Sequence, residues 1–205
     1  MPKTLSDQDI ADFRAELCRV ATERFARYGY DGVTMRQLAE ALGCSPKTPY
    51  RYFKDKDAMM AAVRARGFLR HAMALEAAYQ EAAERGAGRN QAVSEAYIRF
   101  AVENPQAYKL MFDFQQPTMA DYPELVEAAA RSKATMTAHL KSQPQTGSGA
   151  ERAADRELVG HVFWAGLHGA IMLHLTGMLA APNDLGAVVS RMHEIMAAGL
   201  SRPKA

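Results

Sequence analysis

Hydroxyl, aromatic and basic side chains are concentrated in one short stretch of the chain. They are Ser45, Lys47, Thr48, Tyr50, Arg51, Tyr52, Lys54 and Lys56. Ammonium and guanidinium groups bind phosphate oxygens, and together with hydroxyls they donate hydrogen bonds to the edges of bases. Residues 34–56 contain five basic and two acidic side chains. This chemistry favours an interface with an anionic polymer, although a helical hairpin with solvated charges has the same composition.

The elements that would position these side chains are two short helices joined by a tight turn. Thr34 and Gln37 have the spacing of a capping box, which predicts that a helix begins at this point. Gly43 suits a turn with positive φ, and Ala39 is small enough to let two helices cross closely. Ser45 followed by Pro46 predicts the start of the second helix, over 46–53. A short helix of this kind is narrow enough to enter the major groove of DNA.

The rest of the chain is predicted to be helical. Alanine is abundant and β-branched Val and Ile are few, which favours an all-α fold of about nine helices. Asn104-Pro105 and Pro182-Asn183 are expected to interrupt the helices, and 142–149 reads as a loop. The other predicted helices cover about 10–28, 34–42, 55–84, 90–103, 108–114, 121–141, 151–180 and 184–200.

Composition and charge exclude several classes of protein. The formal net charge of +2 does not fit a histone-like polybasic chain, and the 48% hydrophobic content excludes wholesale disorder. Cys18 and Cys44 have neither disulfide-framework nor zinc spacing, so a cytoplasmic protein is expected. Residues 158–183 lack Asp, Glu, Lys and Arg, but their histidines and glycines favour a buried or interfacial helix over a membrane span.

The first 66 residues or so resemble a known family of DNA-binding proteins. The resemblance is carried by FARYGYDGVTMRQLAE at 25–40 and GCSPKTPYRYFKDK at 43–56, in order, spacing and residue type. These segments are similar to the helix-turn-helix domain of TetR-family transcriptional regulators. The resemblance implies an all-helical homodimer, with a small N-terminal DNA-binding domain and a larger C-terminal domain for ligand binding and dimerisation. We expect the first domain to cover 1–55 and the second 56–205, linked by a long helix over 56–85.

The resemblance also implies roles for individual residues. Tyr50 and Lys56 match phosphate contacts of the family, and Thr34 at a helix N-terminus suits a phosphate as well. Lys47 and Thr48 are expected to face base edges, with Arg51 and Tyr52 beside them. Arg36 could reach either a base or a phosphate, and Ser45 and Lys54 complete the predicted interface. Pro49 departs from the family, which usually has an aliphatic residue there; in the first turn of a helix it would be tolerated, although it could tilt the helix.

Aromatic and methionine side chains in the C-terminal part are candidates for an apolar ligand pocket. Plain core packing is the alternative for such a stripe. Because the resemblance implies a cavity, however, soft walls of this type would suit a small, largely apolar effector. The candidate ligand-binding residues are Tyr97, Phe100, Tyr108, Met111, Phe112, Met136, Trp164 and His168.

Residues 164–169 resemble a subgroup of the family whose C-terminal domain carries a W-x3-H-G signature. Trp164 and His168 are four residues apart, on one face of the predicted helix. His168 is interpreted equally well as a core histidine or as a ligand contact. No metal site is expected, because His161 and His168 lack nearby carboxylates and thiolates. The predicted dimer interface contains Ala165, Gly169, Met172, Val188, Met192 and Ile195.

Taken together, the residues and the resemblance predict a dimeric regulator that binds operator DNA. We expect a repressor that is released from a palindromic operator by its effector and that needs no cofactor. The alternative is an enzyme built on a helical bundle, with histidines as general bases. The sequence contains no paired nucleophile and base, no glycine-rich phosphate loop and no metal quartet to support that alternative.

Overall fold

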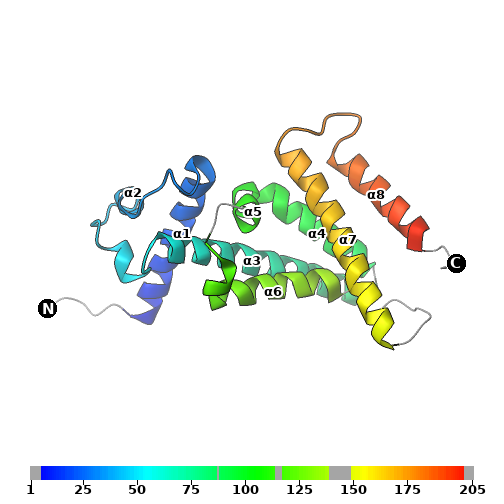
Figure 1. Cartoon of the computed structure of the whole chain (residues 1–205), viewed down its shortest axis with the longest axis horizontal. Coiled ribbons are helices and arrows are strands. Elements are labelled where there is room, and N and C mark those ends of the chain that lie inside the picture. Colours follow the sequence, from blue (N-terminus) through cyan, green and yellow to red (C-terminus); the bar gives the residue numbers. More distant parts are fainter. Residues whose placement is uncertain (1–5, 87, 114–116, 139–148, 201–205) are drawn as a thin grey trace. The chain divides into compact units, whose positions relative to one another are not determined.

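The protein is all-α, as the sequence predicts. The computed structural model describes residues 6–86, 88–113, 117–138 and 149–200 (Figure 1). Within these ranges the chain forms eight α-helices and two short 3-10 turns and no strand. In chain order the elements are α1 (Asp7–Tyr28), α2 (Met35–Ala41), the 3-10 turn η1 (Pro49–Arg51), α3 (Lys56–Glu84), α4 (Arg89–Glu103), α5 (Pro105–Phe112), the 3-10 turn η2 (Met119–Asp121), α6 (Pro123–Ala138), α7 (Gly149–Leu175) and α8 (Leu185–Leu200).

The helices form two compact units. The first unit comprises Met1–Ala72 and Asn104–Ser132, and the second comprises Met73–Glu103 and Lys133–Ala205. The first unit therefore extends past residue 55, where the sequence predicts the end of the DNA-binding domain. It does so because α5 packs against α1, and Leu110 of α5 belongs to the same buried cluster as the α1 side chains.

Two capping boxes define the helix starts in the first unit. Ser6 and Asp9 cap α1, with the Asp9 backbone N–H donating to Ser6 Oγ over 3.1 Å. Thr34 and Gln37 cap α2 in the same way, as the sequence predicts. The helix α1 thus begins at Asp7, earlier than the apolar periodicity from Ile10 indicates, because polar capping residues leave no hydrophobic signal. Gly43 ends α2 with a φ of 63°, which only glycine adopts readily.

An apolar core holds the first three elements together. Leu17 and Phe25 of α1 are almost completely buried against Leu38 of α2. Phe53 and Met60 complete this cluster from the beginning of α3 and the segment before it. Each large apolar side chain buried in this way stabilises the fold by about 1.5–3 kcal/mol. The core fixes the backbone on which the candidate DNA contacts stand.

In the second unit, α7 packs against both α4 and α8. Trp164 of α7 donates its indole N–H to the hydroxyl of Tyr97 in α4 over 2.9 Å. Gly166 lies so close to Met192 of α8 that an added Cβ would meet the sulfur atom at 2.4 Å. The glycine therefore allows α7 and α8 to approach closely, and the two helices lie side by side in Figure 1.

Two helix predictions need correction. The helix predicted over 46–53 is only the 3-10 turn η1, because Pro49 has no backbone N–H to close an α-helical turn. The helix predicted to run to 180 ends at Leu175, where Gly177 takes a φ of 74° and the Met178 N–H donates to the carbonyl of Leu173. The break at Asn104-Pro105 is confirmed, since α4 ends at Glu103 and α5 begins at Pro105.

Candidate nucleic-acid interface

The N-terminus of α2 presents two of the predicted DNA contacts. Thr34 is exposed, and its hydroxyl accepts a hydrogen bond from the backbone N–H of Gln37 over 3.2 Å. Arg36 is also exposed, and its Nε donates to the carboxylate of Glu40 over 2.9 Å. An exposed ion pair of this kind is worth about 1 kcal/mol or less, so the guanidinium can exchange Glu40 for a phosphate at little cost.

The residues Ser45–Tyr52, which we call the reading segment, follow the turn at Gly43. Their backbone is held by hydrogen bonds that span three residues: Thr48 N–H to Ser45 O (2.9 Å), Arg51 N–H to Thr48 O (3.1 Å) and Tyr52 N–H to Pro49 O (3.0 Å). The hydroxyls of Ser45 and Thr48 lie 2.9 Å apart and bond to each other. The reading segment is therefore an ordered pair of tight turns.

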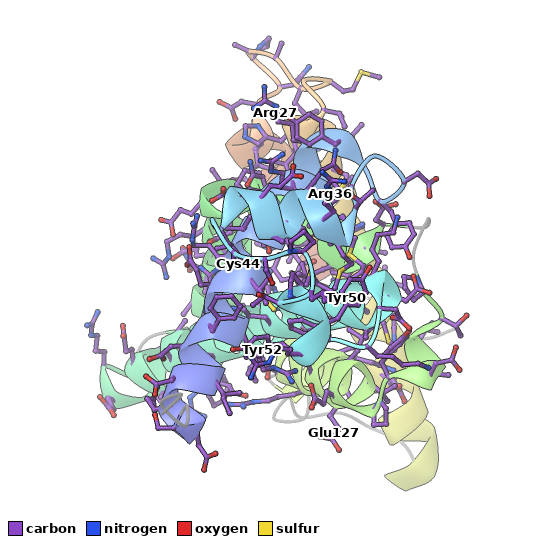
Figure 2. All side chains as sticks on the ribbon, turned by 90° about the vertical axis from the view of Figure 1, so that its left-hand side faces the viewer. Arg27, Arg36, Cys44, Tyr50, Tyr52 and Glu127 are labelled. Atoms are coloured by element: carbon purple, nitrogen blue, oxygen red, sulfur yellow. The ribbon has the colours of Figure 1, made fainter. Side chains whose placement is uncertain are left out.

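Burial divides the reading segment into an anchored side and a free side. Pro49 is buried, and Phe53, which follows the segment, is only 4% exposed. Tyr50, in contrast, is 56% exposed, and Lys47 and Arg51 are exposed as well. Figure 2 looks onto α2 and the reading segment, with Arg36 and Tyr50 on the face turned to the viewer. The side chains of Lys47, Tyr50 and Arg51 therefore face solvent, while the buried Pro49 and Phe53 hold their backbone in place.

Tyr52 is placed differently from the other predicted contacts. It is half-buried, and its ring packs against Phe13 of α1 with centroids 4.7 Å apart. Arg14 donates to the Tyr52 carbonyl over 3.4 Å and stacks over the Phe53 ring at 4.7 Å. Packing against α1 is thus a structural role for Tyr52 that the sequence alone does not reveal.

Lys56, at the start of α3, has intramolecular partners. Its ammonium donates to the Tyr30 carbonyl over 3.0 Å and lies 3.9 Å from the centre of the Tyr30 ring. These contacts hold the side chain in one place. An ammonium has three N–H donors, so two remain for a phosphate. Lys54, two residues earlier, is exposed.

A further cationic group at the end of α1 was not among the predicted contacts. The guanidinium groups of Arg24 and Arg27 lie 6.0 and 5.2 Å from the Tyr28 ring, and Tyr28 is 49% exposed. The signal in the sequence is two arginines and a tyrosine directly before the turn at Gly29. Arg27 is labelled together with Arg36 in Figure 2.

Comparison with known proteins identifies the family. Residues 17–63 match the family of bacterial regulatory proteins described as tetR family, and residues 91–196 match the family described as tetracyclin repressor-like, C-terminal domain. The chain belongs to the TetR family. Members of this family are transcriptional regulators and not enzymes, so the histidine-based enzyme considered from the sequence is not retained.

Individual relatives of this TetR-family chain are similar over different shares of its length. The HTH-type transcriptional repressor Rv1474c of Mycobacterium tuberculosis is 40% identical over 63 residues, which are 31% of this chain and 33% of that protein. The match thus spans about a third of the relative's length. The uncharacterized HTH-type transcriptional regulator Rv0681 of the same organism is 28% identical over 86% of this chain and 76% of its own. A solved structure of a protein with unknown function from Rhodococcus sp. RHA1 superimposes with a TM-score of 0.74 at 27% identity, covering 98% of this chain and 100% of the other.

The predicted ligand-binding residues of this TetR-family chain belong to both units. Tyr108, Met111 and Phe112 lie in the first unit, where Tyr108 and Phe112 pack edge to face at 5.1 Å. The second unit contains the others, of which Tyr97, Phe100 and Met136 are buried and Trp164 is half-buried. His168 is half-buried too, and burial lowers the pKa of its imidazole. The predicted residues are thus mostly core residues of their own units.

The predicted dimer residues lie on α7 and α8. Ala165 and Gly169 are exposed, and no atom lies within 4 Å of a Cβ placed on Gly169. Three further apolar side chains, Leu158, Val162 and Leu173, continue this stripe along α7 and are 63%, 54% and 44% exposed. On α8, Ile195 is 61% exposed, while Val188 and Met192 are half-buried. Met172, on α7, is half-buried as well. The two helices therefore present an apolar surface.

Length and composition alone make Glu157–Leu175 of α7 long and apolar enough to cross a membrane. This helix packs against α4 and α8, and 22% of the apolar stretch is buried. In the part of the chain that the structure describes, no group of three or more His, Cys, Asp or Glu side chains is placed to bind a metal ion.

Proposed function

We propose that this TetR-family chain is a transcriptional repressor that binds operator DNA as a homodimer. The observation that carries the proposal is the reading segment, whose exposed Lys47, Tyr50 and Arg51 stand on the buried Pro49 and the Phe53 that follows. Donors fixed on a rigid base lose little conformational freedom when they bind, which favours specific contacts. The proposed DNA-binding domain covers 1–55, and 56–205 serve dimerisation and effector binding in a cytoplasmic protein.

In the proposed complex, two kinds of contact have different tasks. Lys47 and Thr48 donate to base edges in the major groove and set the preferred sequence. Thr34, Tyr50, Lys54 and Lys56 bind phosphates and fix the register of the protein on the duplex. The cations at the end of α1, Arg24 and Arg27, extend the phosphate contacts.

The distribution of charge supports separate roles for the base contacts and the phosphate contacts. Residues 1–66 contain 12 basic and 9 acidic side chains, whereas the whole chain has a net charge of only +2. A dimer brings two such segments to one duplex, but the excess is small. Nonspecific attraction to the phosphate backbone is therefore modest, and base contacts supply much of the specific affinity.

The homodimer is proposed to form through the apolar surface of α7 and α8. It is supported by the exposed stripe on α7 and by the groove of ≈ 430 Å³ along α8, which Val188, Met192 and Ile195 help to line. Two reading segments must reach successive major grooves, roughly 34 Å apart. A palindromic operator follows from the twofold symmetry of the dimer.

We further propose that a small, largely apolar effector releases the DNA. An effector shifts the equilibrium only if it binds better to a conformation in which the spacing of the reading segments no longer fits the operator. The buried Tyr97 and Phe100, and Trp164 beside them, would supply contacts for an apolar ligand in the second unit.

The test begins with selection of genomic fragments that the full-length protein retains. Fluorescence anisotropy should then give a saturable complex with a twofold-symmetric site. A reporter gene behind that site should be repressed. Binding that is equal for all sequences would overturn the operator proposal, and increased transcription would overturn the assignment as a repressor.

Apolar compounds that raise the Tm of the protein should also dissociate the complex.

A further inference from the structure

The hydrogen bonds of the reading segment differ from those of an α-helix. Within residues 45–52, which the structure describes completely, the backbone N–H groups of Thr48, Arg51 and Tyr52 each donate to the carbonyl three residues earlier. A bond over four residues follows only at Phe53, whose N–H donates to the Pro49 carbonyl over 3.0 Å. The turn η1 covers only Pro49–Arg51. The helical geometry expected of this segment is thus replaced by tighter turns.

Pro49 is the cause of this difference. A helix that began at Pro46, with Ser45 as its N-cap, would close its first turn with a bond from the N–H of residue 49 to the Ser45 carbonyl. Proline has no N–H, and the Ser45 carbonyl accepts instead from Thr48. The Ser45 hydroxyl bonds to the Thr48 hydroxyl and caps no backbone N–H.

The tighter turns change which side chains share a face. In an α-helix successive residues are rotated by 100°, so residues four apart, such as Lys47 and Arg51, lie together. With three residues per turn, residues three apart lie together, which pairs Lys47 with Tyr50. Over four residue steps an ideal 3-10 helix and an ideal α-helix differ by about 80° in direction and about 2 Å in rise, which sets the scale of the change between Lys47 and Arg51.

We propose that Pro49 is a specificity-determining residue that acts by positioning Lys47 and Arg51. It is buried and does not itself face DNA. By holding the reading segment in tight turns it places Lys47 on the same side as Tyr50, where Lys47 meets base edges and Tyr50 meets the adjacent phosphate, and it turns Arg51 away from that side. This inference rests on the proposed binding of operator DNA.

Pro49→Ala restores the missing N–H and tests the proposal. The preferred sequences of the full-length wild type and variant are compared by selection from a randomised double-stranded DNA library. We expect Pro49→Ala to prefer different bases under the reading segment, while its affinity for nonspecific DNA and its salt dependence stay the same. Pro46→Ala is the matched control, because a proline at the first helical position removes no bond; this variant should keep the wild-type preference.

A second substitution separates positioning from a general structural effect. In the wild type, Arg51→Ala should weaken binding to all sequences by a similar factor, because the exposed Arg51 is turned away from the face that meets the bases. In the Pro49→Ala background it should cost about tenfold in affinity for the newly selected sequence, because Arg51 there shares a face with Lys47. Pro49→Leu, which keeps an apolar side chain at this buried position, replaces Pro49→Ala if the latter loses its cooperative thermal transition.

The outcomes distinguish this inference from the proposed function. If the wild type selects no sequence at all, the operator proposal fails. If the wild type selects a sequence and the folded Pro49 variants select the same one, only the role of Pro49 is overturned. An equal effect of Arg51→Ala in both backgrounds would also overturn it.

Discussion

Lys47 and Lys56 are both basic, but their surroundings predict different effects on DNA binding. Lys56 is held by the Tyr30 carbonyl and ring, at a fixed place where a phosphate can be met. Lys56→Ala should weaken binding to all sequences by a similar factor and reduce the salt slope by about one. Lys47→Ala should cost about 1–3 kcal/mol on the preferred site and relax the choice of base there. Titrations of specific and nonspecific duplexes at several salt concentrations would measure both.

For Lys56→Ala, a loss of protein stability must be distinguished from the loss of a DNA contact. Because its ammonium also contacts Tyr30, the variant could lose stability. Thermal unfolding of Lys56→Ala therefore accompanies the titrations. A change of base preference in a stable Lys56→Ala protein would contradict the assignment of this residue to a phosphate.

His71 predicts a dependence of stability on pH. Its side chain is 1% exposed and its Nδ1 lies 2.8 Å from the Ser132 hydroxyl. Burial lowers the pKa of this imidazole from 6.5 to about 4, because the charged form is poorly solvated. The unfolded chain therefore binds a proton below about pH 6.5 that the native state does not bind until about pH 4.

The contribution of neutral His71 to the free energy of unfolding is thus complete above pH 6.5. It is lost as the pH falls toward 4, which lowers the free energy of unfolding by about 3 kcal/mol at most. Urea unfolding at pH 7.0 and 4.5 measures the difference. In His71→Gln, which has no group that titrates here, stability should fall less between these two pH values. An unchanged pH dependence in this variant would assign the acid sensitivity to other groups.

At the level of secondary-structure elements, the cap of α2 links stability to the interface. Thr34→Ala removes the oxygen that accepts from Gln37 and should lower the free energy of unfolding by about 1 kcal/mol. Thr34→Ser keeps the hydroxyl and should restore most of that stability. Denaturant unfolding of the two variants would measure the cap separately from any DNA contact. Equal losses in both would indicate that the methyl group, and not the cap, matters.

Local signals allowed most of the elements to be predicted. The capping box at Thr34 and the break at Asn104-Pro105 depend on neighbours in the sequence, and the structure confirms both. The prediction of an α-helix over 46–53 was wrong. Ser45-Pro46 is a helix start signal, but Pro49 has no N–H to close the first α-helical turn. One residue decides there between an α-helix and a 3-10 turn.

The candidate site was predictable only to the level of residue types. Tyr50 and Tyr52 are two residues apart and chemically identical, yet one is exposed and the other packs on Phe13. That difference depends on α1, more than 35 residues earlier in the chain. The ligand candidates likewise divide between two compact units, and this division follows from tertiary packing that no periodicity reveals.

For the whole molecule, Gly169 provides a test of the dimer. A Cβ added at this position meets no atom of its own subunit within 4 Å, and replacing a helical glycine usually stabilises the helix. Gly169→Arg should therefore leave the monomer folded but block the close approach of a partner helix. We expect sedimentation velocity to find monomers and operator affinity to drop sharply.

Gln80→Arg, at an exposed position of α3 in the same unit, adds the same side chain away from the proposed interface and should remain dimeric. Both variants should keep a Tm near that of the wild type. A Gly169→Arg protein that still sediments as a dimer would move the interface away from the α7 stripe.

The hydrogen bond from Trp164 to Tyr97 also gives the protein an intrinsic optical probe. Trp164 is the only tryptophan in the sequence, so all indole emission comes from one position on α7. The emission wavelength of an indole depends on the polarity and hydrogen bonding around it. Fluorescence titration with unlabelled compounds can therefore detect binding near Tyr97 without a dye, and the Trp164→Phe protein supplies the blank.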